Sequence, residues 1–250
     1  MTGGPSFCFS IVSHGHDETL RTLLADFRQL AGAEIRLVVV LNIPARADLE
    51  AEFADLPITW VRNPEQRGFA ANNNTAFALC REDVFVTVNP DVSFDGLDLV
   101  RAATCLADPG VGCCAPVCLN EDGSASDNAR TFPTLWSLAR RVVGGRQGKP
   151  ELVAVPDADA LSADWLSGAF IFFDAAAFRA VGGFDEGYRL YMEDVDMGKK
   201  QEKAGYRRLL LPDLKVVHVG RRESRINMRH LRWHVGSLAR YFAKSALNAW

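Results

Sequence analysis

The stretch VFVTVNPDV, residues 84–92, carries the pattern on which the prediction of the fold rests. Residues 84–88 are apolar or β-branched without interruption, which is typical of a strand buried on both faces of a sheet. Asn89, Pro90 and Asp91 follow, and all three residue types favour turns. The stretch therefore predicts a central strand that ends in a polar turn carrying the carboxylate of Asp91.

Similar apolar runs alternate with helical patterns on both sides of this stretch. Strands are predicted at 7–12, 35–41, 58–61 and 111–117, and helices at 17–29, 47–54, 68–80 and 96–107. This alternation predicts an α/β protein with a doubly wound, mostly parallel central sheet and helices on both faces. No Gly-x-Gly-x-x-Gly motif follows the first strand, which argues against a dinucleotide-binding Rossmann domain.

The second half of the chain is less regular. Residues 118–162 are interrupted by Gly and Pro and predict loops, with one helix around 134–143. Beyond them the sequence predicts a helix capped by Asp174, a helix at 192–204, two short strands within 206–211 and 215–219, and a helical C-terminal extension at 227–246. One face of that extension is apolar, with Met228, Leu231, Val235, Leu238 and Phe242 at helical spacing.

Charge is distributed unevenly along the chain. The 250 residues carry a net charge of −3, which does not point to nucleic acid as a partner. Residues 221–250 contribute +6 and the remainder −9. A basic amphipathic helix with aromatic residues suits an anionic or membrane surface, although its apolar face also suits packing on the rest of the protein or on a second subunit.

The six cysteines show no paired Cys-x-x-Cys spacing. We interpret them as buried or free thiols of a reducing compartment, not as a zinc site or a disulfide framework. The first 18 residues lack the basic and apolar regions of a signal peptide, and no apolar run approaches the ~20 residues of a membrane-spanning helix. We expect a cytoplasmic protein, with peripheral contact at the inner face of the membrane left open.

Polar residues at the carboxyl ends of the predicted strands are candidates for ligand binding, because ligands of parallel sheets bind there. Ser13, Asn42 and Asn63 follow the first three strands. Asp91 is suited to hold a divalent cation on a diphosphate, although Asn-Pro-Asp is also an ordinary turn. His218 ends an apolar strand and is either a metal ligand or a structural core histidine.

Two predicted helices begin with residues suited to chemistry. Glu193, Asp194 and Asp196 open one of them, where acids either complement the helix dipole or, beside apolar surface, act as general bases with raised pKa values. Arg67 precedes the other, whose first turns contain Asn72-Asn73-Asn74. A helix N-terminus with a nearby Arg favours phosphate or a nucleotide, and the alternative is a polar loop with helix caps.

Taken together, these segments resemble family 2 glycosyltransferases with the GT-A fold, most closely the rhamnosyltransferase-like branch. Matching pieces occur in the family's order and cover residues 7–220, with 118–162 the weak part: SIVSHG, RGFAANNN, VTVNPDV, WLSGAFIFF, FRAVGGFDEGYRLYMEDVDM, KAGYRRLLLP and VVHVG. The resemblance implies a GT-A catalytic domain at 1–220, with a nucleotide-binding half at 1–117 and an acceptor-binding half at 118–220. The basic amphipathic helix of 221–250 would follow it.

The resemblance also implies roles for individual residues. Asp91 matches the carboxylate that binds Mg²⁺ or Mn²⁺ on the nucleotide diphosphate, and His218 matches a second ligand of metal or phosphate. Asn89 takes the first place of that motif, where many relatives carry Asp. Asp194 matches the catalytic base, and Glu193 a neighbouring acid near the acceptor.

Four further positions match the site of the nucleotide sugar. They are Ser13 at the end of the first strand, Arg67 before the Gly-Phe pair, Asn74 after it, and Gly168 in the segment that floors the sugar pocket. Two departures bear on the identity of the nucleotide base. Asn42 stands where relatives usually carry an acid, and Gln66 where they often carry Asn.

The implied reaction is an inverting, metal-dependent transfer of a sugar from a nucleotide-sugar donor. The resemblance implies L-rhamnose from dTDP-rhamnose as the sugar, and a hydroxyl of a bacterial surface glycan or lipid-linked precursor as the acceptor. The alternatives are transfer of another hexose from a UDP- or GDP-sugar and a catalytically weak sugar-nucleotide binding module. A nucleotidyltransferase is disfavoured, because residues 13–22 are not a Gly- and basic-rich loop. A homodimer also remains open.

Overall fold

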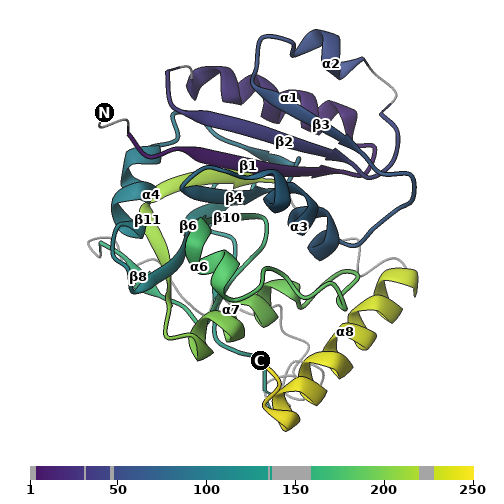
Figure 1. Ribbon diagram of the computed structural model, residues 1–250, viewed down its shortest axis with the longest axis vertical. Helices are drawn as coiled ribbons and strands as arrows, with labels where there is room; N and C mark the ends of the chain where they lie inside the picture. The colour runs from purple at the N-terminus through teal and green to yellow at the C-terminus, as the bar shows by residue number, and fades with distance from the viewer. Residues whose placement is uncertain (1–3, 31, 46–47, 135, 137–158, 220–227) are drawn as a thin grey trace.

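A computed structural model describes residues 4–30, 32–45, 48–134, 136, 159–219 and 228–250 (Figure 1). The helix predicted around 134–143 falls almost entirely outside the described residues, as do the basic residues at 221, 222 and 225.

In the described part of the chain, nine strands form one sheet in the order β3-β2-β1-β4-β10-β6-β11-β5, with β8 paired to β11. The strand bounds are β1 (Phe7–Ser13), β2 (Ile35–Leu41), β3 (Ile58–Arg62), β4 (Val84–Val88), β5 (Val92–Ser93), β6 (Val111–Leu119), β8 (Leu161–Ser162), β10 (Phe170–Asp174) and β11 (Arg207–His218). A separate pair joins β7 (Ala129–Arg130) to β9 (Trp165–Leu166). Strands β1, β2, β3, β4, β6 and β11 share one direction, while β10 runs against both of its neighbours. The mostly parallel sheet is therefore confirmed.

Helices cover both faces of the sheet, as predicted (Figure 1). Helices α1 (Asp17–Phe27), α2 (Leu49–Glu52) and α4 (Leu99–Leu106) pack on one face, and α3 (Phe69–Leu79), α6 (Ala175–Ala180) and α7 (Glu193–Lys203) on the other. Neighbouring strand residues alternate between the two layers, so that Phe9 faces the first layer and Cys8 the second. Two buried faces explain why the strands read as unbroken apolar runs.

The second half of the sheet departs from the prediction at one place. The two short strands expected within 206–211 and 215–219 are a single strand, β11. Its register with β6 shifts between Leu211 and Lys215, and pairing resumes beyond the shift. Pro212 lies in this bulge, where its missing N–H removes no ladder hydrogen bond.

Helix α8 (Met228–Leu247) is the predicted C-terminal extension. Its Tyr241 is buried against the segment that leads into α7. Lys244 Nζ lies 3.0 Å from Asp185 Oδ2 and 2.5 Å from Asp196 Oδ1, so ion pairs also fix the helix in place. Among the described helices, none has both the length and the apolar composition required to cross a bilayer.

Candidate active site

A cavity of about 480 Å³ opens at the carboxyl ends of β1 and β4. It is lined by residues from five segments: Val12 to Thr19 after β1, Gln66 to Phe69 before and in α3, Asn89 to Asp91 after β4, Arg189 to Tyr191 before α7, and His230 with Trp233 on α8. The predicted residues Arg67, Asn89 and Asp91 therefore share one cavity. Its position is the one expected for a ligand of a parallel sheet.

Asp91 and His218 meet because the two strands that carry them pair. β5 begins one residue after Asp91 and pairs antiparallel with the end of β11, where His218 lies opposite Val92. His218 Nε2 is 3.3 Å from Asp91 Oδ1, and the backbone carbonyl of Asp91 accepts a hydrogen bond from Val219 at 3.1 Å. Burial raises the pKa of Asp91, but the hydrogen bond and charge of His218 outweigh it, and the pKa lies below 3.8. The carboxylate is thus kept ionised.

These two side chains fit a divalent cation bound to a diphosphate. A carboxylate oxygen and an imidazole nitrogen at 3.3 Å can ligate one ion together. Mg²⁺ and Mn²⁺ in such sites take their remaining ligands from phosphate oxygens and water. The one group of three metal-ligating side chains in the described residues, Cys8, Cys80 and Glu82, lies at the opposite ends of the strands.

The candidate base is joined to this region through the backbone that precedes β10. Asp194 Oδ2 accepts a hydrogen bond from the N–H of Gly168 at 3.3 Å, and the carbonyl of Ala169 accepts one from the N–H of Asn89 at 2.8 Å. A Cβ on Gly168 would come within 3.1 Å of the Phe69 ring, so this close approach favours Gly. Gly168 therefore positions Asp194 near the turn that carries Asn89 and Asp91.

Glu193 and Asp194 lie in the first turn of α7, and burial raises the pKa of both carboxyl groups. Burial raises the pKa of Glu193 to about 8, with a further contribution from the charge of Asp194. Glu193 Oε2 is buried and makes no hydrogen bond within the described residues. Burial likewise raises the pKa of Asp194, against the hydrogen bonds from Gly168 and Val195. A carboxyl with a raised pKa is suited to accept a proton near neutral pH.

The backbone immediately before these acids is strained. Tyr191 and Met192 both have φ of 70°, a left-handed conformation that costs non-glycine residues ~1–3 kcal/mol each. Tyr191 lines the cavity, and Met192 is the residue before the first turn of α7. Strain of this kind is concentrated at functional sites. Nothing in the sequence predicted it, because neither residue type favours this conformation.

Amide hydrogen bonds join the ends of β2 and β3 to the segment that precedes α3, and these contacts were not predicted from the sequence. Asn42 Oδ1 accepts hydrogen bonds from Asn63 Nδ2 and from the backbone N–H of Arg67, both at 2.8 Å. Asn63 Nδ2 also donates to Asn72 Oδ1 at 2.6 Å, and Ser10 Oγ donates to Asn73 Oδ1 at 2.7 Å. The three adjacent Asn were the available signal, since poor helix formers need compensating contacts.

Of the other donor-site candidates, Arg67 and Asn74 have side-chain partners in the structure. Arg67 lines the cavity, and its guanidinium donates to Thr75 Oγ1 at 2.8 Å and pairs with Glu186 at 3.4 Å. Asn74 donates to the carbonyl of Phe184 at 2.9 Å and accepts from its N–H at 3.0 Å. Ser13 is buried, and its Oγ has no hydrogen-bond partner within the described residues. The remaining predicted site residues do not line the cavity itself; they are Ser13, Asn74, Gly168, Glu193, Asp194 and His218.

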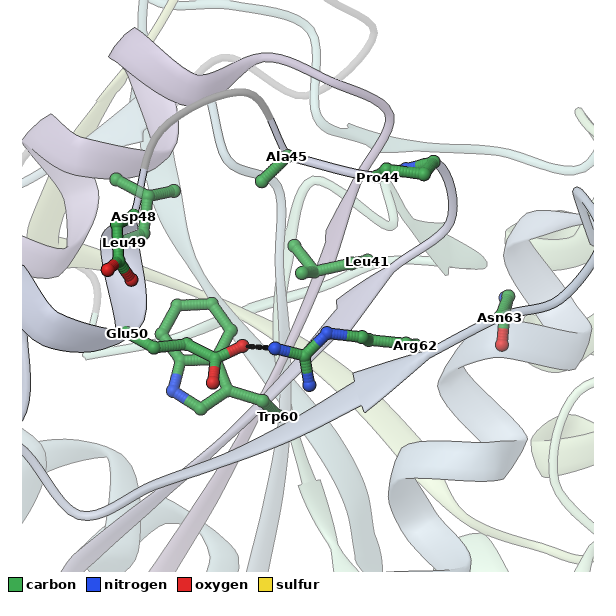
Figure 2. Close-up of a pocket in the computed structure, with 9 residues that line it drawn as sticks. All are labelled: Leu41, Pro44, Ala45, Asp48, Leu49, Glu50, Trp60, Arg62 and Asn63. Carbon is green, nitrogen blue, oxygen red and sulfur yellow. Dashed lines mark hydrogen bonds and ion pairs between the residues drawn. The ribbon is translucent and has the colours of Figure 1, made fainter.

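A second cavity, of about 220 Å³, lies beside the edge strand β3 (Figure 2). Figure 2 shows the ion pair between Arg62 and Glu50 next to the indole of Trp60. Asn63, which belongs to the amide network, lies at one side of it. Of the residues predicted at strand ends, Asn63 lines this cavity, whereas the residues assigned to the metal, the base and the nucleotide sugar do not.

Comparison with known proteins finds relatives that are named rhamnosyltransferases. A stretch of 151 residues is 32% identical to the N-acetylglucosaminyl-diphospho-decaprenol L-rhamnosyltransferase of Mycobacterium tuberculosis, covering 55% of this chain and 47% of that protein. Rhamnosyltransferase WbbL of Escherichia coli K12 is 27% identical over 255 residues, covering 95% of this chain and 92% of WbbL. The chain thus spans about half the length of the mycobacterial relative. No protein-family model matches the chain.

Two solved structures share the architecture. The mannosyltransferase PcManGT of Pyrobaculum calidifontis, in complex with GDP-Man and Mn²⁺, superposes with a TM-score of 0.63 at 19% identity, covering 98% of this chain and 66% of its own. GalNAc-T7 with UDP, GalNAc and Mn²⁺ superposes with the same TM-score at 15% identity, covering 87% of this chain and 44% of its own. The fold is GT-A. In this fold the paired Asp91 and His218 lie at the carboxyl ends of β4 and β11, and Asp91 lines the cavity.

Proposed function

We propose that this protein is an inverting glycosyltransferase that uses a divalent metal and a nucleotide-activated sugar. The observation that carries the proposal is the pairing of Asp91 with His218 at the cavity, with Asp194 held nearby by Gly168. A metal-diphosphate site beside a carboxyl of raised pKa is what a single displacement at a sugar carbon requires. The rhamnosyltransferase names of the sequence relatives support the same class of reaction.

Asp91 and His218 would bind Mg²⁺ or Mn²⁺ together with the donor diphosphate. When bound, the metal supplies positive charge that stabilises the departing nucleoside diphosphate. Arg67, at the rim of the same cavity, adds a fixed positive charge on the donor side. Asn89 would contact the nucleotide sugar at the end of β4. Ser13 and Gly168 would support the floor of the site from beneath, and Asn74 would support this region through the backbone of Phe184.

Asp194 would act as the general base. It accepts the proton of an acceptor hydroxyl while the hydroxyl oxygen forms a bond to the anomeric carbon and the bond to the diphosphate oxygen breaks. One displacement from the face opposite the leaving group inverts the anomeric configuration. Glu193, whose pKa lies at about 8, would remain protonated at neutral pH, so that Asp194 does not share its surroundings with a second negative charge.

For the substrates, we infer L-rhamnose from dTDP-rhamnose and a lipid-linked or surface-glycan acceptor on the cytoplasmic side of the membrane. The names of the relatives from M. tuberculosis and E. coli support the sugar, and the mycobacterial name supports a diphospholipid acceptor. Asn42 stands where relatives usually carry an acid, and its side chain is hydrogen-bonded to Asn63 and Arg67. Because this position bears on the nucleotide base, UDP- and GDP-hexoses are the alternative donors. A weak binding module without transfer is the alternative function.

A donor screen tests the proposal. Thermal stability of the purified protein is measured with dTDP-rhamnose, UDP-sugars and GDP-sugars, each with and without Mn²⁺. A ligand at a hundredfold excess over its Kd stabilises the fold by ~2.7 kcal/mol. We expect stabilisation by one donor only in the presence of metal, and slow release of its nucleoside diphosphate. Stabilisation without any hydrolysis or transfer would favour the binding module, and no response to any donor would overturn both.

A further inference from the structure

We propose that helix α8 forms the acceptor-binding wall of the cavity, where Trp233, Arg189 and His230 bind a saccharide that is carried on a phosphate. This inference rests on the proposed function and names the second substrate of the same site. It starts from the observation that the cavity has two walls of different chemistry. One is built from the strand ends and carries Asp91, and the other is built from α8 and the segment before α7.

The α8 wall is a set of contacting aromatic and cationic side chains. Tyr191 Oη is 3.0 Å from His230 Nδ1, and the rings of His230 and Trp233 lie 5.0 Å apart. The guanidinium of Arg189 lies 5.1 Å from the centre of the Trp233 ring. His230 and Trp233 are partly exposed, and the exposed side of the wall faces the cavity.

This wall has the chemistry of a glycan site. The C–H faces of a sugar ring pack on an indole, which offers a large, rigid apolar surface. Arg189, exposed beside the indole, presents donors in a fork that matches phosphate oxygens. The imidazole of His230, beside the indole, offers a further nitrogen for hydrogen bonding. A sugar with a phosphate attached could pack its ring on the indole of Trp233 while its phosphate binds the guanidinium of Arg189.

The position of the wall suits the acceptor and not the donor. Tyr191 lies two residues before Glu193 and three before Asp194, so the wall is close in sequence to the candidate base. The donor diphosphate would occupy the other side, at Asp91 and His218. A single displacement requires the acceptor hydroxyl to attack the anomeric carbon from the face opposite the diphosphate. An acceptor on the α8 wall and a diphosphate at Asp91 would lie on different walls of the cavity, as this attack requires.

The wall is held rigid from outside the cavity. Ser237 Oγ donates to the carbonyl of Leu190 at 2.9 Å, one turn beyond Trp233. Further along α8, Arg240 and Lys244 both pair with Asp185, and Tyr241 is buried. The strained conformation of Tyr191 is therefore fixed by contacts that a substitution at Trp233 leaves in place.

The test compares Trp233→Ala with Trp233→Phe and with the control Arg232→Ala, an exposed residue of the same helix that does not line the cavity. The probe is farnesyl diphospho-N-acetylglucosamine. Its binding to metal-free protein is measured by calorimetry, and donor hydrolysis and transfer are measured separately. We expect Trp233→Ala to weaken probe binding and raise the acceptor KM by about tenfold or more. Donor hydrolysis should stay within about twofold of wild type, because the donor side is untouched.

Trp233→Phe should recover most of the binding, and Arg232→Ala should behave as wild type. Wild-type affinity in Trp233→Ala, or absence of binding by the wild type, would overturn the assignment. Loss of donor hydrolysis together with acceptor binding would also overturn it, since the wall would then serve the donor. A wild type that binds the probe through Trp233 but neither hydrolyses nor transfers any donor would instead contradict the proposed function alone.

Discussion

At the scale of single residues, the surroundings of the site's acids shift their pKa values in opposite directions. Asp91 is held below its ordinary pKa by His218, whereas burial holds Asp194 and Glu193 above theirs. One carboxylate is thus available as a permanent anion for a cation, and the others can exchange protons. Carboxyl groups with opposite pKa shifts at one site are typical of enzymes that need both a fixed charge and a base.

We expect Asp194→Asn to reduce transfer by ~10²–10⁴-fold, because loss of a general base has this effect. Binding of the nucleoside diphosphate should stay within a few-fold of wild type, since Asp194 contacts Gly168 and not the Asp91 pair. Turnover and nucleotide affinity of the purified variant are the measurements. Near wild-type turnover in a folded variant would mean that another group takes the proton.

Asp91→Ala should weaken nucleoside diphosphate binding in Mn²⁺ by about tenfold or more, because a charge-assisted contact is worth ~1.5–3 kcal/mol. Asp95→Ala, at an exposed acid four residues along, is the matched control. Calorimetric titration with and without EDTA reports the effect. If EDTA leaves the binding and the turnover of the wild type unchanged, the metal role of Asp91 and His218 is wrong.

The pKa of Glu193 predicts a pH-dependent contribution to stability. It is about 8 in the folded protein against 4.5 as its ordinary value, so the folded state binds an extra proton between these pH values. Stability contributed by the neutral carboxyl is therefore full below about pH 4.5 and declines as pH rises through about 8. Glu193→Gln should remove this decline. We expect its Tm, relative to wild type, to rise between pH 5 and pH 9, by ~2–4 °C for each kcal/mol. If the Tm values of wild type and Glu193→Gln change in parallel with pH, the raised pKa of Glu193 is wrong.

The positions of some candidate residues could be predicted from the sequence, but their partners could not. Asp91 and His218 were placed at strand ends because turn and strand patterns are local properties of the chain, and the structure brings the two within 3.3 Å. The pairing of β5 with β11 that joins them depends on strand order, which no local pattern encodes. Asn74 matched a nucleotide-site position, yet both of its amide atoms bind the backbone of Phe184, 110 residues away. Contacts over such separations follow from packing and not from periodicity.

At the scale of elements, α8 combines two surfaces that the sequence pattern did not separate. Leu238 and Phe242 pack on the cluster around Tyr241, as one interpretation of the apolar face expected. Leu231 and Val235, on the same predicted face, are 47% and 57% exposed. The helix is therefore fixed by its C-terminal half and presents apolar side chains outward along its N-terminal half.

The exposed half of α8 predicts a salt-sensitive interaction with anionic vesicles. Arg240 and Lys244 belong to the Asp185 ion pairs, so replacing them would undock the helix. The informative variant is Leu231→Gln with Val235→Gln. We expect wild type to co-sediment with phosphatidylglycerol vesicles at low salt and to be released as salt screens the basic residues, each worth ~1 kcal/mol at most. The double variant should bind less. Equal binding of wild type to neutral and anionic vesicles would make the exposed face unrelated to membranes.

At the scale of the whole molecule, the halves of the chain are interleaved in one sheet. The first ~120 residues read correctly as alternating strands and helices, and the bounds predicted for β2 and β4 are those observed. The insertion of β10 between β4 and β6 was not predicted. The sequence pattern of the first half does not show that an antiparallel strand from residues 170–174 will pair there.

This interleaving predicts that residues 1–119 do not fold as an independent unit. Without β10, β4 has an unpaired edge, and the apolar side chains of Val86 and Phe85 lose Phe172 and Phe173 as neighbours. We expect the 1–119 fragment to show poor amide dispersion in NMR spectra and no cooperative thermal transition. Adding residues 159–219 as a separate chain should restore structure. A cooperatively folded 1–119 fragment would instead make the first half an autonomous domain.

The place of β10 also bears on how the protein is made. A ribosome adds ~5–20 residues per second, so the partner of β4 is produced several seconds after β4 itself. During that interval the nascent chain carries an open edge strand that contains Phe85 between valines, the kind of surface that pairs with other chains. Slower elongation between residues 88 and 170 would lengthen the exposure, whereas chaperones that cover extended apolar segments would shorten it. The yield of soluble protein should therefore depend on the rate of translation through this interval.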